Sequence, residues 1–206
     1  SFDFPTGTSN LGGEYTAGND AAIPDNVPSY TSNSDGNWDD VNIWTPTAPP
    51  GGPNGFIVVI RAVDSVSTNG NRRFAYRTTI DGVLDVNDSW GHNLGTVNGT
   101  GKLYLEDAIL PAGRFTSFFS CSGGTLEYGG SSSYTIIADR IDTVKNLFFT
   151  GTGTKTLPNK DLVICNLLKI DGPALNNDLY DRKLTLLGAL QRLNTGAFIS
   201  GTGATA

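Results

Sequence analysis

Short runs of β-branched, aliphatic and aromatic residues recur along most of the chain, separated by clusters of Gly, Asn, Asp and Ser. This pattern is typical of strands joined by turns. A helical period of about 3.6 is weak everywhere and is most visible from Lys183 to Leu193, which also alternates as a strand. The chain is therefore predicted to be almost entirely β. The runs lie at 56–63, 74–86, 101–107, 114–120, 124–130, 134–138, 146–151, 161–172, 183–190 and 196–201.

Several runs in the second half end in glycine, at Gly129, Gly151, Gly172, Gly188 and Gly201. The intervals of 22, 21, 16 and 13 residues form a loose repeat, which is typical of repeat architectures. Glycine suits the corners of a coil because it tolerates left-handed backbone. We predict a parallel β-solenoid. An antiparallel β-sandwich is the alternative, and it is less favoured because tight Asn-Gly and Asp-Gly hairpin signals are sparse.

The first 55 residues are rich in Gly, Asn, Asp, Ser, Thr and Pro and contain little apolar periodicity. We interpret residues 1–55 as a loop-rich N-terminal cap and residues 56–206 as solenoid repeats. A solenoid needs capped ends because open strand edges pair with other chains, and the C-terminal end carries no evident cap. Alternation predicts these inward positions: Ile57, Val59, Leu103, Leu105, Leu126, Leu147, Phe149, Leu162, Ile164, Leu184 and Leu186.

The composition narrows the classes of partner. With 26 glycines and only 17% charged residues, it favours turns and strands. The net charge of -6 lacks the basic footprint of a nucleic-acid or anionic-membrane binder. We therefore expect no nucleic-acid partner. No apolar run approaches the roughly 20 residues that cross a bilayer, so we also expect no membrane insertion. Methionine is absent, even at position 1, which predicts a fragment or processed product of a longer chain.

The chain offers few residues for metal or nucleophile chemistry. His92 is the only histidine and there is no Cys-x-x-Cys motif, so a zinc site or a catalytic triad has little to be built from. Cys121 and Cys165 lie in β-like contexts, where a free cysteine usually behaves as a small buried hydrophobe. We expect that state, with a disulfide as the alternative.

The repeats resemble those of a known group of proteins. The stretches GGTLEYGGSSSYTI, NLFFTGTGTKTLPNKDLVICNLLKIDG and KLTLLGALQRLNTGAFISGTG resemble strand repeats of large cell-surface proteins of Bacteroidetes, with GTGTKTL the most specific piece. GNWDDVNIWTP resembles the opening that precedes such repeats, so the likeness covers roughly residues 35–206. It implies a solenoid exported by the type IX secretion system that acts as an adhesin or a stalk. The family's secretion signal is a separate C-terminal domain, so export is implied only for a longer parent.

The resemblance also implies a modification. Asp64-Ser65-Val66 and Asp142-Thr143-Val144 are similar to the Asp-Ser/Thr-hydrophobic site at which Bacteroidetes O-glycosylate exported proteins, which makes Ser65 and Thr143 candidates. An Asp next to a hydroxyl is equally typical of a turn in which the carboxylate bonds its own backbone.

The favoured function is a non-enzymatic structural or adhesive segment of a larger secreted bacterial surface protein, whose partners are other domains of the parent chain, surface proteins or glycans. A glycan-binding module is the first alternative. It needs an indole ring free of the core, and Trp38, Trp44 and Trp90 are the candidates. Packing against the core is the more frequent state of such rings, although Trp90 lies in a polar insertion between strands.

A polysaccharide lyase or hydrolase is the second alternative, since such enzymes need clustered acids, often with an arginine. The segment 139–142 is the one dense cluster beyond the cap. Alternation places Arg140 and Asp142 on one face as a surface ion pair, and Glu127 or Asp161 would have to join them. We assign no catalytic residue.

Calcium is a separate question. Asp35, Asn37, Asp39 and Asp40 offer hard oxygen ligands close together. Their spacing lacks the glycine and the terminal glutamate of a calcium loop. No cofactor is expected, with a structural calcium ion here as the alternative.

Overall fold

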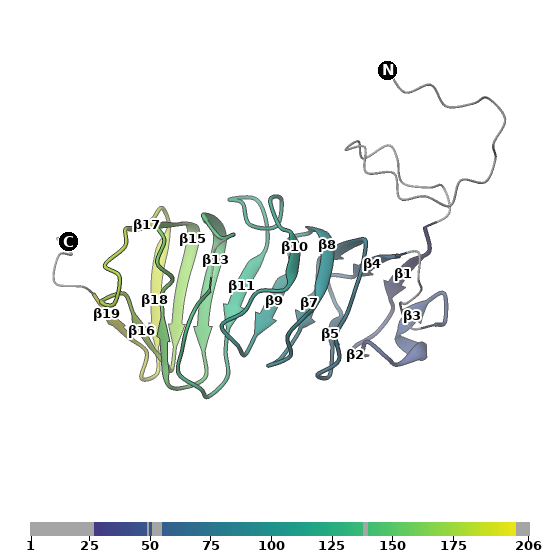
Figure 1. Ribbon diagram of the computed structural model, residues 1–206, viewed down its shortest axis with the longest axis horizontal. Coiled ribbons are helices and arrows are strands. Elements are labelled where there is room, and N and C mark those ends of the chain that lie inside the picture. Colours follow the sequence, from purple (N-terminus) through teal and green to yellow (C-terminus); the bar gives the residue numbers. More distant parts are fainter. Residues whose placement is uncertain (1–26, 49, 51–54, 138–139, 201–206) are drawn as a thin grey trace, which may run out of the picture.

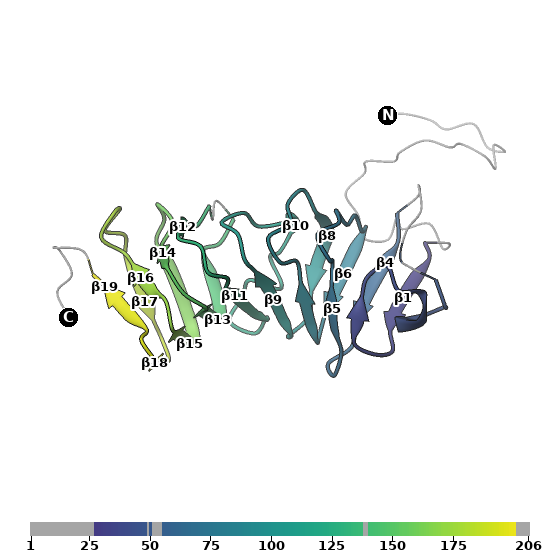
Figure 2. The ribbon, with the colours of Figure 1, turned by 90° about the horizontal axis from the view of Figure 1, so that it is seen from below.

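The computed structural model shows a parallel β-solenoid of about seven turns, drawn out along one axis (Figures 1 and 2). It describes residues 27–48, 50, 55–137 and 140–200. The predicted fold class is confirmed, and the alternative sandwich is wrong. Among the described residues no helix is long and apolar enough to span a membrane.

Three sheets run side by side along the axis, and each coil contributes strands to two or three of them. The described part of the chain contains one short helical turn, η2, which spans Val41–Ile43. The first sheet contains β1 (Ser29–Ser32), β3 (Trp44–Thr45), β4 (Ile57–Ile60), β6 (Arg77–Ile80), β8 (Asn93–Asn98) and β10 (Ala112–Arg114). The second contains β2 (Gly36–Asn37), β5 (Ser65–Ser67), β7 (Val83–Asp85), β9 (Lys102–Leu105), β11 (Thr125–Tyr128), β13 (Thr143–Thr150), β15 (Leu162–Asp171), β17 (Leu184–Leu186) and β18 (Ala189–Leu193). The third contains β12 (Tyr134–Thr135), β14 (Thr154–Thr156), β16 (Ala174–Asn176) and β19 (Ala197–Ile199).

The core is a set of stacked rows, because parallel register places like residues above one another. In the second sheet Leu84, Leu103, Leu126, Leu147 and Leu168 are successive register partners, and all are buried. Each coil therefore hides its inward face only by lying on its neighbours.

The predicted inward positions from Leu103 to Ile164 are confirmed as buried, and Leu184 and Leu186 are partly buried against the core. The prediction was wrong in β4, where Val58 and Ile60 face inward instead of Ile57 and Val59. This strand is apolar on both faces, so alternation of polarity carries no information about its phase.

Glycines mark the corners where consecutive coils approach closely. A Cβ atom on Gly151 would lie 2.2 Å from the Gly130 carbonyl oxygen, and one on Gly172 would lie 2.3 Å from that of Gly151. All three have positive φ. The repeat seen at Gly151 and Gly172 is thus a stack of corners. Gly188 instead follows β17 and approaches the Asn166 carbonyl group, so the interval from Gly172 to Gly188 joins two different corners. Gly201 lies outside the described residues.

The N-terminal end of the described solenoid is closed. Strand β3 pairs antiparallel with β1, while β1 pairs in parallel with β4. Trp38 and Trp44 are fully buried there in an edge-to-face pair, and the indole nitrogen of Trp44 donates to the Trp38 carbonyl oxygen at 2.9 Å. Residues 29–45, which fall within the predicted cap, thus supply the first strands of two sheets. Residues 1–26 lie outside the described residues.

The opposite end differs. Strands β17, β18 and β19 are each the last strand along their ladder (Figure 1). Leu184, Leu190 and Phe198 stand over Leu162, Leu168 and Leu175, which continues the inward rows. Nothing among the described residues covers this end.

The two cysteines form a disulfide between the loop after β10 and strand β15. The expectation of two free, buried thiols was wrong, since Cys121 is exposed and Cys165 only half-buried. Both point to the outside, and β13 separates β11 from β15 in the sheet order, so the bond joins non-adjacent coils. The pairing was not evident from the sequence because the two cysteines are 44 residues apart.

Candidate functional site

A groove lies on the outside of the solenoid where the first sheet ends at β10. In the next coil Arg140 bonds the Pro111 and Gly113 carbonyl groups, and the strand that follows it, β13, pairs with β15 and not with β10. The intervening segment 115–124 fills the gap with Phe115, Phe118 and Phe119, whose rings pack on one another.

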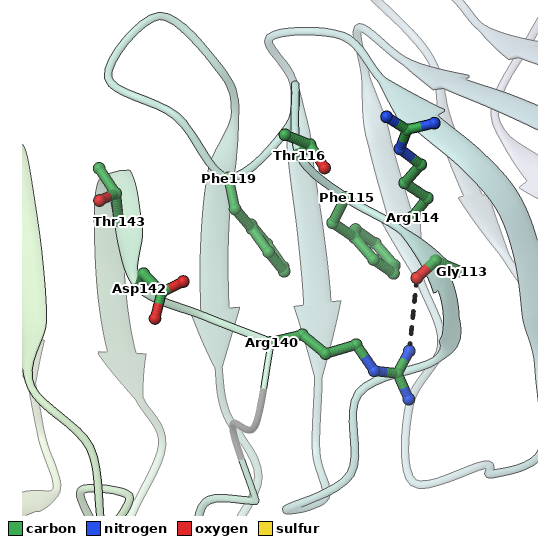
Figure 3. Close-up of a pocket in the computed structure, with 8 residues that line it drawn as sticks. All are labelled: Gly113, Arg114, Phe115, Thr116, Phe119, Arg140, Asp142 and Thr143. Atoms are coloured by element: carbon green, nitrogen blue, oxygen red, sulfur yellow. Dashed lines mark hydrogen bonds between the residues drawn. The ribbon is translucent and has the colours of Figure 1, made fainter.

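The groove consists of two hollows of about 430 and 350 Å³ that share Arg114 and Thr116. Figure 3 shows the larger one: Arg140 extends from one wall toward the Gly113 carbonyl group on the other, and the rings of Phe115 and Phe119 lie between. We call the following set the groove residues: Arg77, Thr96, Asn98, Gly113, Arg114, Phe115, Thr116, Ser117, Phe119, Arg140, Asp142 and Thr143.

Two arginines lie on alternate strands of the first sheet. Arg77 of β6 and Arg114 of β10 are both register partners of Thr96 on β8, between them. Strands are spaced by about 4.8 Å, so the two Cα atoms lie about 10 Å apart. Neither guanidinium group forms a hydrogen bond or an ion pair with the part of the chain that the structure describes. Arg140 is anchored instead, donating to the carbonyl oxygens of Pro111 and Gly113 at 3.3 and 3.4 Å.

The carboxylates considered for catalysis have other partners. Asp142 is exposed at the groove mouth and forms an ion pair with Lys160. Glu127 lies on the outside of β11, paired with Lys102 at 2.9 Å and accepting a hydrogen bond from Thr150. Asp161 accepts from the backbone of Lys183. Asp139 lies outside the described residues.

The three tryptophans differ in their exposure to solvent. Trp38 and Trp44 are fully buried, so the hypothesis that they present rings to a glycan is wrong; their indoles close the end of the core. Trp90 is 60% exposed, so the more frequent state of a ring packed on the core does not hold for it, and the Arg72 guanidinium lies 4.2 Å from the ring centroid. Exposed Phe74 and Tyr76 occur in the preceding coil.

The four proposed calcium ligands are engaged by the protein. Asp35 accepts from the Ser65 backbone, Asn37 from the Asp39 backbone, and Asp40 caps η2. The Arg73 guanidinium holds the pKa of Asp39 below its usual range through two hydrogen bonds. Within the described ranges no three His, Cys, Asp or Glu side chains form a group that could hold a metal ion.

The two O-glycosylation candidates are placed differently. Ser65 is exposed at the start of β5, while the preceding Asp64 is buried and bonded to Ser32 and Arg61. Thr143 is half-buried and lines the groove beside Asp142.

Sequence reasoning missed the groove because its two free arginines lie in separate strand runs. The usable signal was weak: one arginine lies in the predicted strand run 74–86 and another at the start of the run 114–120. Comparison with known proteins adds nothing, since no family model matches the chain and no curated protein or solved structure is significantly similar to it.

Proposed function

We propose that this chain is a non-enzymatic structural and adhesive segment of a larger bacterial surface protein, extended by further β structure at its C-terminal end. The asymmetry of the two described ends carries this proposal. One end is closed by β3 and two indoles. The other presents three strand edges and a hollow of about 620 Å³ lined by Leu184, Leu186, Leu190 and Phe198.

The surface formed by β17, β18 and β19 is suited to the packing of a further coil. Unpaired parallel strands present rows of N–H and C=O groups to a next strand. Leu190 is exposed there, and a stacked coil would remove it from water. Arg192 stands over Ile170 in an inward row and donates to the Gly196 carbonyl oxygen. An inward charge of this kind restrains indiscriminate pairing, so the next coil should offer Arg192 an acceptor.

Sedimentation velocity of the purified chain over a range of concentrations tests this surface. We expect reversible end-to-end association that Leu190→Glu abolishes, because the carboxylate would be buried without a partner. Val63→Glu is the matched control, since Val63 is exposed far from this end. A strictly monomeric wild-type chain, or equal association of the Leu190→Glu variant, would contradict the proposal.

A polysaccharide-degradation assay tests the non-enzymatic part. We expect no loss of chain length from any polysaccharide, with or without Ca²⁺. Cleavage that disappears with Asp142→Asn would establish the enzyme instead.

Glycan binding is the second candidate function, favoured by Trp90. The ring is exposed while Arg72 holds it in place, and a fixed indole is a suitable surface for stacking a sugar. A glycan array tests it: binding that is lost with Trp90→Ala supports the module, and binding that persists in this variant removes Trp90 from it.

A further inference from the structure

We propose that the groove binds a carboxylate-bearing polysaccharide laid across strands β6, β8 and β10. This inference is independent of the open C-terminal end and of Trp90.

The charges of the groove favour an anion. Among the described residues, Arg77, Arg114 and Arg140 line it, with one carboxylate, that of Asp142, which forms an ion pair with Lys160. The guanidinium groups of Arg77 and Arg114 are without protein partners in the described part of the chain. A guanidinium group matches a carboxylate through two parallel hydrogen bonds. The chain as a whole has a net charge of -6, so these two arginines make the groove locally more basic than the rest of the protein.

The neutral groups of the groove favour a sugar chain. Thr96 and Asn98 lie on β8 between the two arginine strands, and Thr116 and Ser117 follow β10. Their hydroxyl and amide groups both donate and accept, as sugar hydroxyls require. A ligand that crosses the strands meets a new strand about every 4.8 Å, and the arginines at every second strand would meet charges about 10 Å apart. This arrangement suits a polymer with charges spaced by sugar units.

Two other polyanions fit less well. Double-stranded DNA carries a charge about every 1.7 Å of its axis, which the acidic remainder of this protein would repel. A single strand stacks its bases on aromatic rings, and the described groove residues offer no exposed ring. Phe115 and Phe119 are buried. An acidic peptide usually binds a sheet by adding a strand at an edge, whereas Arg77 and Thr96 lie on the face of β6 and β8, which are paired with strands on both sides.

The groove is built on a fixed frame. Arg77 and Thr96 belong to central strands of the first sheet. The segment 115–124, whose rings lie between the two walls, is joined to β15 by the disulfide of Cys121. A site that is ordered before binding loses less entropy when the ligand arrives.

Fluorescence polarisation with labelled polygalacturonate tests the proposal. We expect binding at 50 mM NaCl that weakens at 200 mM, and a loss of about tenfold in affinity for each of Arg77→Gln and Arg114→Gln because each removes one charge-assisted pair. Arg182→Gln is the matched control. Arg182 is an exposed arginine in the loop between β16 and β17 that donates to Asn159. Circular dichroism checks that each variant keeps its β structure.

Competition identifies the ligand class. Dextran sulfate should compete and neutral dextran should not, because the arginines recognise the anion. Tighter binding of polyglutamate or of a single-stranded oligonucleotide would overturn the choice of a polysaccharide. Unchanged binding in the Arg77→Gln and Arg114→Gln variants, or no binding of polygalacturonate, would overturn the site itself.

Discussion

The ammonium group of Lys155 lies 4.3 Å from the centroid of the Tyr134 ring, within the face formed by β12 and β14. Lys155 is fully buried and donates to the carbonyl oxygens of Gly130 and Ser132. Burial lowers the pKa of this lysine. The lysine of the GTGTKTL stretch thus joins two coils, since it donates to two carbonyl groups of the turn between β11 and β12 in the preceding coil.

We expect Lys155→Met to lower the free energy of unfolding by about 1–3 kcal/mol, since the stem still packs but the Ser132 carbonyl group loses its donor and the Gly130 carbonyl group keeps only the Thr152 backbone donor. Urea denaturation measures the change. Lys145→Met is the control: Lys145 is half-buried in β13 without a bonding partner in the described structure, so its replacement should stay within about 0.5 kcal/mol. Equal effects of the two substitutions would refute this role.

His92 makes stability depend on pH. The ring is buried, its Nδ1 atom accepts from the Arg73 backbone, and Ser89 lies at hydrogen-bond distance from Nε2. Burial lowers the pKa of His92 below 6.5. The unfolded chain therefore takes up a proton below about pH 6.5 before the folded protein does, and this contribution to stability is lost as the pH falls below that value. Melting temperatures between pH 7.5 and 5 should fall more steeply in the wild type than in His92→Gln. Parallel curves would show that another group governs the acid limb.

The disulfide closes a loop with a sequence separation of 44 residues. Restricting the unfolded chain to this extent is worth about 3–4 kcal/mol in the chain-entropy description. We expect the double variant Cys121→Ala/Cys165→Ala to lose an amount of this order, and reduction of the wild type to lose a similar amount. Guanidinium denaturation with and without reductant measures both, and coinciding midpoints would show that the bond adds nothing.

Strand β4 offers a matched pair. Val58→Thr places a hydroxyl group in the core and should cost about 1–3 kcal/mol, whereas Val59→Thr on the half-buried outer face should stay within about 0.5 kcal/mol. Thermal denaturation of the two variants distinguishes them. The reverse order would mean that the strand has the opposite phase.

The sequence predicted the solenoid because each coil repeats a local pattern of strand and glycine corner. It predicted the phase of strands such as β9, where Lys102 and Tyr104 contrast with Leu103 and Leu105. It failed where the decision is not local: β4 is apolar on both faces, and Cys121 meets Cys165 only after two coils have stacked.

The groove is a property of the stack for the same reason. Its arginines become neighbours through the register of β6, β8 and β10, and its depth comes from the interruption of the first sheet after β10. No window of the sequence contains both features. The exposure of the indoles could not be predicted for the same reason, since Trp38 and Trp90 both lie in polar segments. Trp38 is buried where β3 pairs with β1, at the closed end of the solenoid.

The register between β11, β13 and β15 has a consequence for the length of the molecule. Asn146 donates to Thr125, 21 residues earlier, and the rows that follow advance by one coil without changing face. Inserting or removing a whole coil would change the length by about 4.8 Å and leave every side chain on its side. Inserting one residue within a strand would turn a buried row toward the solvent. The length of such a molecule can therefore vary only in discrete steps of one coil.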